Sequence, residues 1–146
     1  MLNLHQILNM HVNKPASDIH IKEAEAKLNM VFPHAYQVSE SQLNMVLPHA
    51  YKTLLKQSNG CSIGGDLLLY GTEDIVERNK TWEVQQYASG YVAIGDDGGG
   101  RVFLMRQAED EKKVWIVDAG VMDPQHAELV AEDLLSWVNE GCFIEV

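Results

Sequence analysis

Tyr91–Met105, which reads YVAIGDDGGGRVFLM, is the stretch of sequence that decides the fold. Two apolar runs suited to β-strands flank a cluster of Asp and Gly, residues that tolerate the positive φ angles of tight hairpin turns. Each run is too short for an independent helix. The stretch therefore predicts a β-hairpin at the centre of a sheet, with the other elements packed around it.

The N-terminal half predicts helices. Apolar spacing predicts a short helix over residues 4–11, a helix over Ile19–Met30 capped by Ser17 or Asp18, and a helix over Tyr51–Gln57.

The C-terminal half predicts strands and two more helices. Leu67–Tyr70 predicts a strand, residues 72–79 a helix, and Lys113–Asp118 a third strand of the central meander. Asp123-Pro124 predicts the start of a last helix, which ends at Gly141. Its expected buried stripe is Ala127, Val130, Leu134 and Val138.

These elements predict one α+β domain over residues 1–146. Its expected core is a central, mostly antiparallel sheet, a meander around residues 91–118, flanked by N-terminal and C-terminal helices.

A near-identical repeat interrupts the N-terminal helical part. Leu28–Tyr36 reads LNMVFPHAY and Leu43–Tyr51 reads LNMVLPHAY, so the copies lie 15 residues apart and differ at one position. Two short copies cannot bury the faces of a solenoid, which favours a local tandem duplication over residues 28–51. The added segment forms an extra helical turn pair, lengthens a loop, or exchanges between protomers to make a homodimer.

Acidic residues concentrate in the second half of the chain. The formal net charge is −10 and the pI is about 4.9. Residues 1–65 hold four acidic and five basic residues, residues 66–146 hold seventeen acidic and six basic, and no Lys or Arg follows Lys113. Nucleic-acid binding is not expected, because it needs clustered cations. The charge would steer a basic protein partner to the C-terminal half, although acidity that serves only solubility explains it as well.

Eight acidic residues are candidates for contact with such a partner. Glu128 and Glu132 lie four residues apart on the predicted last helix, where like charges cost a few tenths of a kcal/mol. A helix face that keeps this repulsion between like charges either binds a partner or is only exposed to solvent. The candidate partner-binding residues are Glu73, Asp74, Glu77, Asp96, Asp97, Glu128, Glu132 and Asp133.

The sequence shows no catalytic, cofactor or metal motif. Gly95–Gly100 (GDDGGG) leads into a strand, whereas a phosphate-binding loop leads into a helix N-terminus. The adjacent Asp96 and Asp97 lack the alternate spacing of a calcium loop, and the six histidines form no ligand pattern. We expect no enzyme activity, no cofactor and no metal. A small hydrolase acting through Asp96 and Asp97 is the least favoured hypothesis, behind the two non-enzymatic roles given below.

Cysteine usage and the N-terminus predict a cytoplasmic protein. Cys61 and Cys142 are two cysteines in a chain large enough to need no disulfide, which predicts reduced thiols. The N-terminus, MLNLHQILNMHVNK, lacks the basic start and long apolar region of a signal peptide. No apolar run is long enough to span a bilayer, so no membrane association is expected.

Several short motifs follow one another in a specific order along the chain. They are Ile21–Glu25 with Leu28, PHAYKTLLKQSNG (Pro48–Gly60), LLLYGTEDIVERN (Leu67–Asn79), Trp82, YVAIGDDGGG (Tyr91–Gly100) and VWIVDAG (Val114–Gly120). This order resembles the SUKH superfamily, the group of Smi/Knr-type proteins. The resemblance covers roughly residues 17–140, and the duplication is its one departure from the family pattern.

The resemblance implies a mixed sheet flanked by helices and a non-enzymatic role. Bacterial members of the superfamily are typically immunity proteins that neutralise polymorphic toxins, often nucleases, and fungal members regulate cell-wall synthesis and signalling. The acidic charge fits the first group, because a nuclease is basic where it grips phosphate. We therefore expect an immunity protein that binds a cognate toxin directly. The alternative is a Smi/Knr-like regulatory or scaffold interaction protein without a toxin partner.

Overall fold

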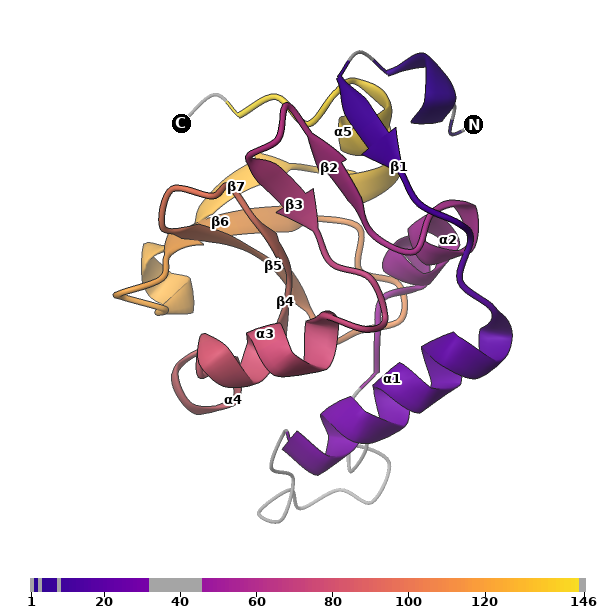
Figure 1. Cartoon of the computed structure of the whole chain (residues 1–146). Coiled ribbons are helices and arrows are strands. Elements are labelled where there is room, and N and C mark those ends of the chain that lie inside the picture. Colours follow the sequence, from indigo (N-terminus) through magenta and orange to yellow (C-terminus); the bar gives the residue numbers. More distant parts are fainter. Residues whose placement is uncertain (1, 3, 8, 32–45, 145–146) are drawn as a thin grey trace.

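The computed structural model of the chain describes residues 2, 4–7, 9–31 and 46–144 (Figure 1). The strands are β1 (Met10–Val12), β2 (Cys61–Ile63), β3 (Leu67–Leu69), β4 (Tyr91–Asp96), β5 (Arg101–Arg106), β6 (Val114–Asp118) and β7 (Glu128–Ala131). The α-helices are α1 (Asp18–Val31), α2 (His49–Gln57), α3 (Ile75–Thr81), α4 (Val84–Tyr87) and α5 (Leu134–Asn139). The described residues also include the 3₁₀ turns η1 (Leu4–Gln6) and η3 (Pro124–His126).

In the described residues, the strands form one sheet whose spatial order, β1 to β7, follows the order of the chain. Each neighbouring pair of these strands is antiparallel. The sheet is therefore a simple meander, and the mixed sheet that the resemblance implied is wrong. β4 is the middle strand, which confirms the expected α+β domain with the hairpin at its centre (Figure 1).

The turn between β4 and β5 is built by Asp97. Its Oδ1 accepts hydrogen bonds from the backbone N–H groups of Gly99 (2.8 Å) and Arg101 (3.0 Å). Its Oδ2 accepts from Nε of Arg101 at 2.9 Å. Gly98 and Gly100 take φ values of 75° and 98°, which side chains disfavour. Residues 97–100 therefore form the predicted hairpin turn, while Gly95 and Asp96 end β4.

Helices cover both faces of the central strands. Val92–Gly95 and Val102–Met105 are buried at every position, although successive side chains of a strand point to opposite faces. α3 and α4 contact β4, while α2 contacts α5. The Trp137 ring of α5 meets Phe103 of β5 edge to face, with ring centroids 5.0 Å apart.

Several predicted elements are confirmed and two are wrong. The helices over Ile19–Met30 and Tyr51–Gln57 exist as α1 and α2, and the N–H of His20 donates to Oγ of Ser17, the predicted cap, at 3.1 Å. The helix predicted over residues 4–11 is instead η1 followed by β1, which pairs with a strand, β2, that the sequence did not predict.

The predicted last helix is also wrong over its first half. The segment after Asp123 forms η3 and then β7, and only residues 134–139 are helical. The expected stripe of Ala127, Val130, Leu134 and Val138 therefore does not lie on one helix. β7 pairs with β6, and this long-range pairing overrides the helix propensity of the Ala, Glu and Leu residues in the segment.

Most of the duplicated segment lies outside the described residues. Leu28 of the first copy and Leu47 and Tyr51 of the second are buried in the core. The extra helical turn pair, the longer loop and the exchange between protomers all concern residues 32–45, so they stay predictions.

Candidate functional site

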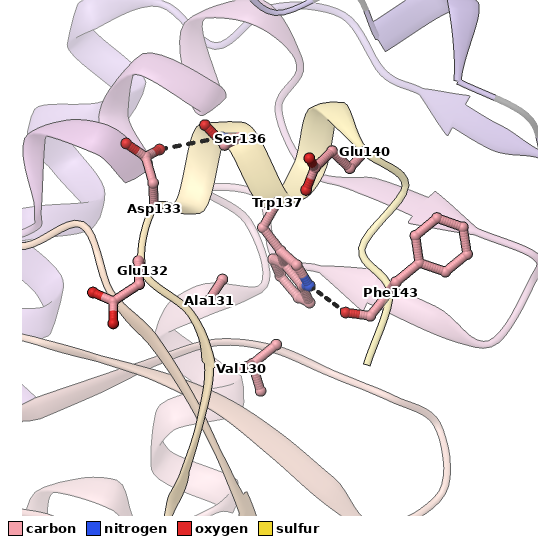
Figure 2. A pocket seen from close by; sticks show the side chains of 8 residues that line it. All are labelled: Val130, Ala131, Glu132, Asp133, Ser136, Trp137, Glu140 and Phe143. Atoms are coloured by element: carbon pink, nitrogen blue, oxygen red, sulfur yellow. Dashed lines mark hydrogen bonds between the residues drawn. The ribbon is translucent and has the colours of Figure 1, made fainter. Parts of the chain in front are cut away.

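A groove of about 780 Å³ lies where β7 passes into α5 (Figure 2). We call it the β7–α5 groove. Its lining residues are Val130, Ala131, Glu132, Asp133, Ser136, Trp137, Glu140 and Phe143.

Local hydrogen bonds fix the shape of the β7–α5 groove. Asp133 caps α5, because its Oδ1 accepts from the N–H of Ser136 at 3.1 Å. Gly141 ends the helix with a φ of 98°, a conformation that suits glycine. The chain then turns back, and Nε1 of Trp137 donates to the carbonyl oxygen of Phe143 at 2.8 Å (Figure 2).

The groove has an apolar floor and an exposed aromatic side chain. Trp137 is only 4% exposed and joins the groove to the core, whereas Phe143 is 74% exposed. Leu129 of β7, which precedes the lining residue Val130 in the sequence, is 38% exposed. A large exposed aromatic residue beside a groove is typical of binding surfaces, because its burial by a partner removes apolar area from water.

Carboxylates surround this floor. Glu132 and Asp133 lie on one side of Trp137, and Glu140 lies on the other with Phe143 (Figure 2). A second hollow of about 210 Å³ shares Asp133 and adds Glu109 and Asp110 from the loop between β5 and β6. We call Glu109, Asp110, Glu132, Asp133 and Glu140 the acidic rim.

Little positive charge offsets the acidic rim. Lys112 is the one Lys or Arg among the described residues that line either hollow. Glu111 also lines the second hollow, and its Oε2 forms an ion pair with Nε of Arg106 at 4.0 Å. The surface therefore carries a net negative charge around an apolar centre, which complements a basic surface with an apolar anchor.

The structure does not bring the eight predicted partner-binding residues together. Glu132 and Asp133 line the β7–α5 groove, and Glu128 begins β7, beside a separate hollow that includes Arg101 and His126. Because Glu128 is on a strand, the predicted helical pair with Glu132 is wrong. The rest lie elsewhere: Glu73, Asp74 and Glu77 at the start of α3, and Asp96 and Asp97 at the end of β4 and in the hairpin turn.

Besides Asp133, which caps α5, three of the eight carboxylates have hydrogen-bond partners among the described residues. Oδ2 of Asp96 accepts from the hydroxyl of Tyr70 at 2.6 Å, and Oδ1 accepts from the N–H of Gly98 at 3.0 Å. Asp97 builds the hairpin turn. Glu77 accepts hydrogen bonds from Arg78 and Thr81, which lower its pKa to about 2. These contacts give each carboxylate a structural use.

The tyrosine bonded to Asp96 belongs to a larger network. The Tyr70 hydroxyl also accepts from Nε1 of Trp82 at 2.9 Å, and the carbonyl oxygen of Tyr70 accepts from the buried hydroxyl of Tyr51. Burial and the bond to Asp96 raise the pKa of Tyr70 well above its usual value. The phenol is therefore a neutral hydrogen-bonding group that joins Trp82 to Asp96 of β4, while the backbone of Tyr70, just after β3, bonds to Tyr51 of α2.

The remaining chemistry is sparse. Among the described residues, no group of three or more His, Cys, Asp or Glu side chains could hold a metal ion. Cys61 and Cys142 are free and buried, and burial raises the pKa of Cys61 to about 11, which disfavours the nucleophilic thiolate. Within the same part of the chain, no helix has the length and apolar character needed to cross a membrane.

A helix-covered meander with an acidic, aromatic groove defines a small α+β domain suited to binding another protein. The family model described as the SMI1 / KNR4 family (SUKH-1) matches residues 37–140, and the chain belongs to this family. Its members are Smi/Knr-type immunity or regulatory proteins, generally without enzymatic activity. The match includes the second copy of the repeat and every strand from β2 to β7, and begins after β1 and α1. A search of curated protein sequences found no significant match.

Proposed function

We propose that the protein is a cytoplasmic immunity protein that neutralises a cognate toxin by direct binding through the acidic rim. Membership of the family supports an immunity or regulatory role. The observation that carries the proposal is the acidic rim itself, of which Glu132, Asp133 and Glu140 line the same groove as the exposed Phe143. No Lys or Arg follows Lys113 in the sequence.

The electrostatics favour a basic partner such as a nuclease toxin. A nuclease grips phosphate with clustered cations, and the carboxylates of the acidic rim could occupy the same cations. Opposite charge on two surfaces speeds their encounter, while an exposed aromatic residue such as Phe143 supplies affinity when a partner buries it. Glu132, Asp133 and Glu140 line the same β7–α5 groove as Phe143 (Figure 2).

The test uses the product of the neighbouring gene as the toxin. Cells that express this product should stop growing, and co-expression of the protein should restore growth and yield a complex that copurifies. A complex without protection, or with a partner that has no toxic activity, would instead support the regulatory or scaffold role.

The hydrolase hypothesis has its own test. Asp96 accepts hydrogen bonds from Tyr70 and Gly98. Asp97 accepts them from Gly99 and Arg101. We propose that the protein is not an enzyme and that both carboxylates stabilise the turn. Toxin protection that survives an Asp96→Asn, Asp97→Asn double substitution, in a protein that still folds, would remove the need for catalysis there.

A further inference from the structure

We propose that the partner contributes a basic, extended segment that adds to the free edge of β7 as a further strand and places an apolar side chain against Phe143. The inference rests on the proposed function and specifies how the same surface is used. It is carried by three features of the described residues: an edge strand, its charge, and the groove at its end.

β7 is an edge strand with one partner. It pairs with β6 through Ala131–Val114, Leu129–Trp115 and Glu128–Ile116, and it is the last strand in the order of the sheet. No other strand in the described part of the chain pairs with its outer side. The backbone N–H and C=O groups on that side can therefore bond to an added strand, a common mode of peptide recognition.

The side chains of β7 favour a basic strand over another copy of β7. Glu128 begins the strand and Glu132 follows it, so acidic residues lie at both ends of a short apolar centre. Like charges placed opposite each other on paired strands are destabilising, whereas opposite charges stabilise the pair. Two copies of this edge would repel, but a strand with Lys or Arg at matching positions would be attracted.

The β7–α5 groove continues directly from this edge. Val130 and Ala131 belong both to β7 and to the groove lining, and Phe143 stands exposed at the far side of Trp137 (Figure 2). A strand laid along β7 would bring its next residues into the groove. An apolar side chain there could cover Phe143, while the acidic rim binds the flanking cations.

The opposite edge of the sheet lacks these features. β1 has three residues, Met10, His11 and Val12, and none of them is acidic. It therefore provides an internal control, because edge-strand pairing that depends on backbone alone would use either edge.

The experiment measures amide hydrogen exchange and chemical shifts on the full chain, with two synthetic peptides as probes. One peptide alternates Lys and Val over nine residues, and the other alternates Glu and Val. The Lys peptide should shift the signals of β7 and Phe143 and slow exchange in β7 about tenfold or more. The Glu peptide should do neither. Equal responses to both peptides, no response in β7, or a response confined to β1 or α3 would overturn the inference.

Phe143→Ala tests the anchor. The Phe143 side chain is mostly exposed, and its bond with Trp137 uses the backbone carbonyl, so the fold should persist. We expect the Lys peptide to bind about tenfold more weakly, because exposed aromatic anchors dominate such contacts. Ile19→Ala, which removes a similarly exposed apolar side chain from α1, is the matched control and should leave binding unchanged. Equal affinities of the two variants would refute the anchor.

The complex with the toxin separates this inference from the proposed function. Growth protection with unprotected β7 amides in the complex would overturn strand addition and leave the immunity role intact. Absence of growth protection, together with selective binding of the Lys peptide at β7, would overturn the proposed immunity role and leave strand addition at β7 supported.

Discussion

The side-chain amide of Asn79 forms a reciprocal pair of hydrogen bonds with the backbone of Ala93. Nδ2 of Asn79 donates to the Ala93 carbonyl at 2.9 Å, and the Ala93 N–H donates to Oδ1 of Asn79 at 2.8 Å. Asn79 is fully buried on α3. β3 pairs with Gly95 and Asp96 of β4 but does not reach Ala93. The side chain of Asn79 therefore forms the two backbone hydrogen bonds at Ala93 that a longer β3 would otherwise form. This contact attaches α3 to the centre of the sheet.

Asn79→Ala should therefore lower the free energy of unfolding by about 2–4 kcal/mol, because it leaves two buried backbone groups without partners. Chemical denaturation monitored by fluorescence measures the loss. Lys80→Ala, an exposed position on the same helix, should change stability by less than about 0.5 kcal/mol. Equal effects of the two substitutions would show that the Asn79–Ala93 pair contributes little.

Gly95, in β4, and Gly99, in the hairpin turn, should respond differently to alanine. A Cβ atom on Gly95 would lie 2.3 Å from the carbonyl oxygen of Leu68, so β3 would have to move. A Cβ on Gly99 would meet nothing closer than a carboxylate oxygen of Asp97, 3.5 Å away. We expect Gly95→Ala to cost about 3 kcal/mol or more and Gly99→Ala less than about 1 kcal/mol. Thermal unfolding of both variants tests this, and similar melting temperatures would contradict the close approach of β3 to β4.

The carboxylate of Asp97 should make stability depend on acid pH. Burial raises its pKa, but hydrogen bonds from the N–H groups of Gly99 and Arg101 and the nearby guanidinium outweigh burial and lower the pKa below its usual value. A pKa that is lower in the folded state stabilises the fold above the pKa of the unfolded chain, and this contribution is lost as the pH falls through the lowered value.

Asp97→Asn should therefore reduce stability at pH 7 and flatten its decline below about pH 4. Unfolding free energies measured from pH 7 to pH 2.5 test this prediction. Asp110→Asn, an exposed loop position with the same change of charge, is the control. The prediction fails if the two variants show the same pH profile.

The centre of the fold could be predicted from sequence because its determinants are local. Asp97 and the glycines around it specify the turn, and continuous apolar runs specify the two buried strands. β7 could not be predicted in this way. Its residues are compatible with a helix, and they form a strand because β6 presents an edge to them, which is a long-range event that spacing alone does not encode.

The candidate surface was partly predictable. Glu132 and Asp133 were among the predicted partner-binding residues, and the lack of Lys and Arg after Lys113 pointed to the part of the chain that lines the β7–α5 groove. Glu109, Asp110, Glu140 and Phe143 were not predicted. Glu109 and Asp110 come close to Asp133 only because the loop after β5 lies beside the start of α5. That proximity depends on the order of the strands in the sheet.

The most direct test of a toxin-binding acidic rim is a comparison of two charge reversals. Glu132→Lys with Glu140→Lys changes the β7–α5 groove at exposed positions, and Lys at position 140 suits the C-terminal end of α5. Glu73→Lys with Asp74→Lys makes the same change of charge at exposed positions at the start of α3, a helix that lies apart from α5 (Figure 1).

Titration of the inactivated toxin by calorimetry gives the dissociation constant of each variant, with circular dichroism to confirm that both fold. We predict that the groove variant binds about 100-fold more weakly, with a reduced dependence on salt, and that the α3 variant stays within about threefold of the unsubstituted protein. Equal affinities of the two variants, or a larger loss from the α3 variant, would contradict binding through the acidic rim.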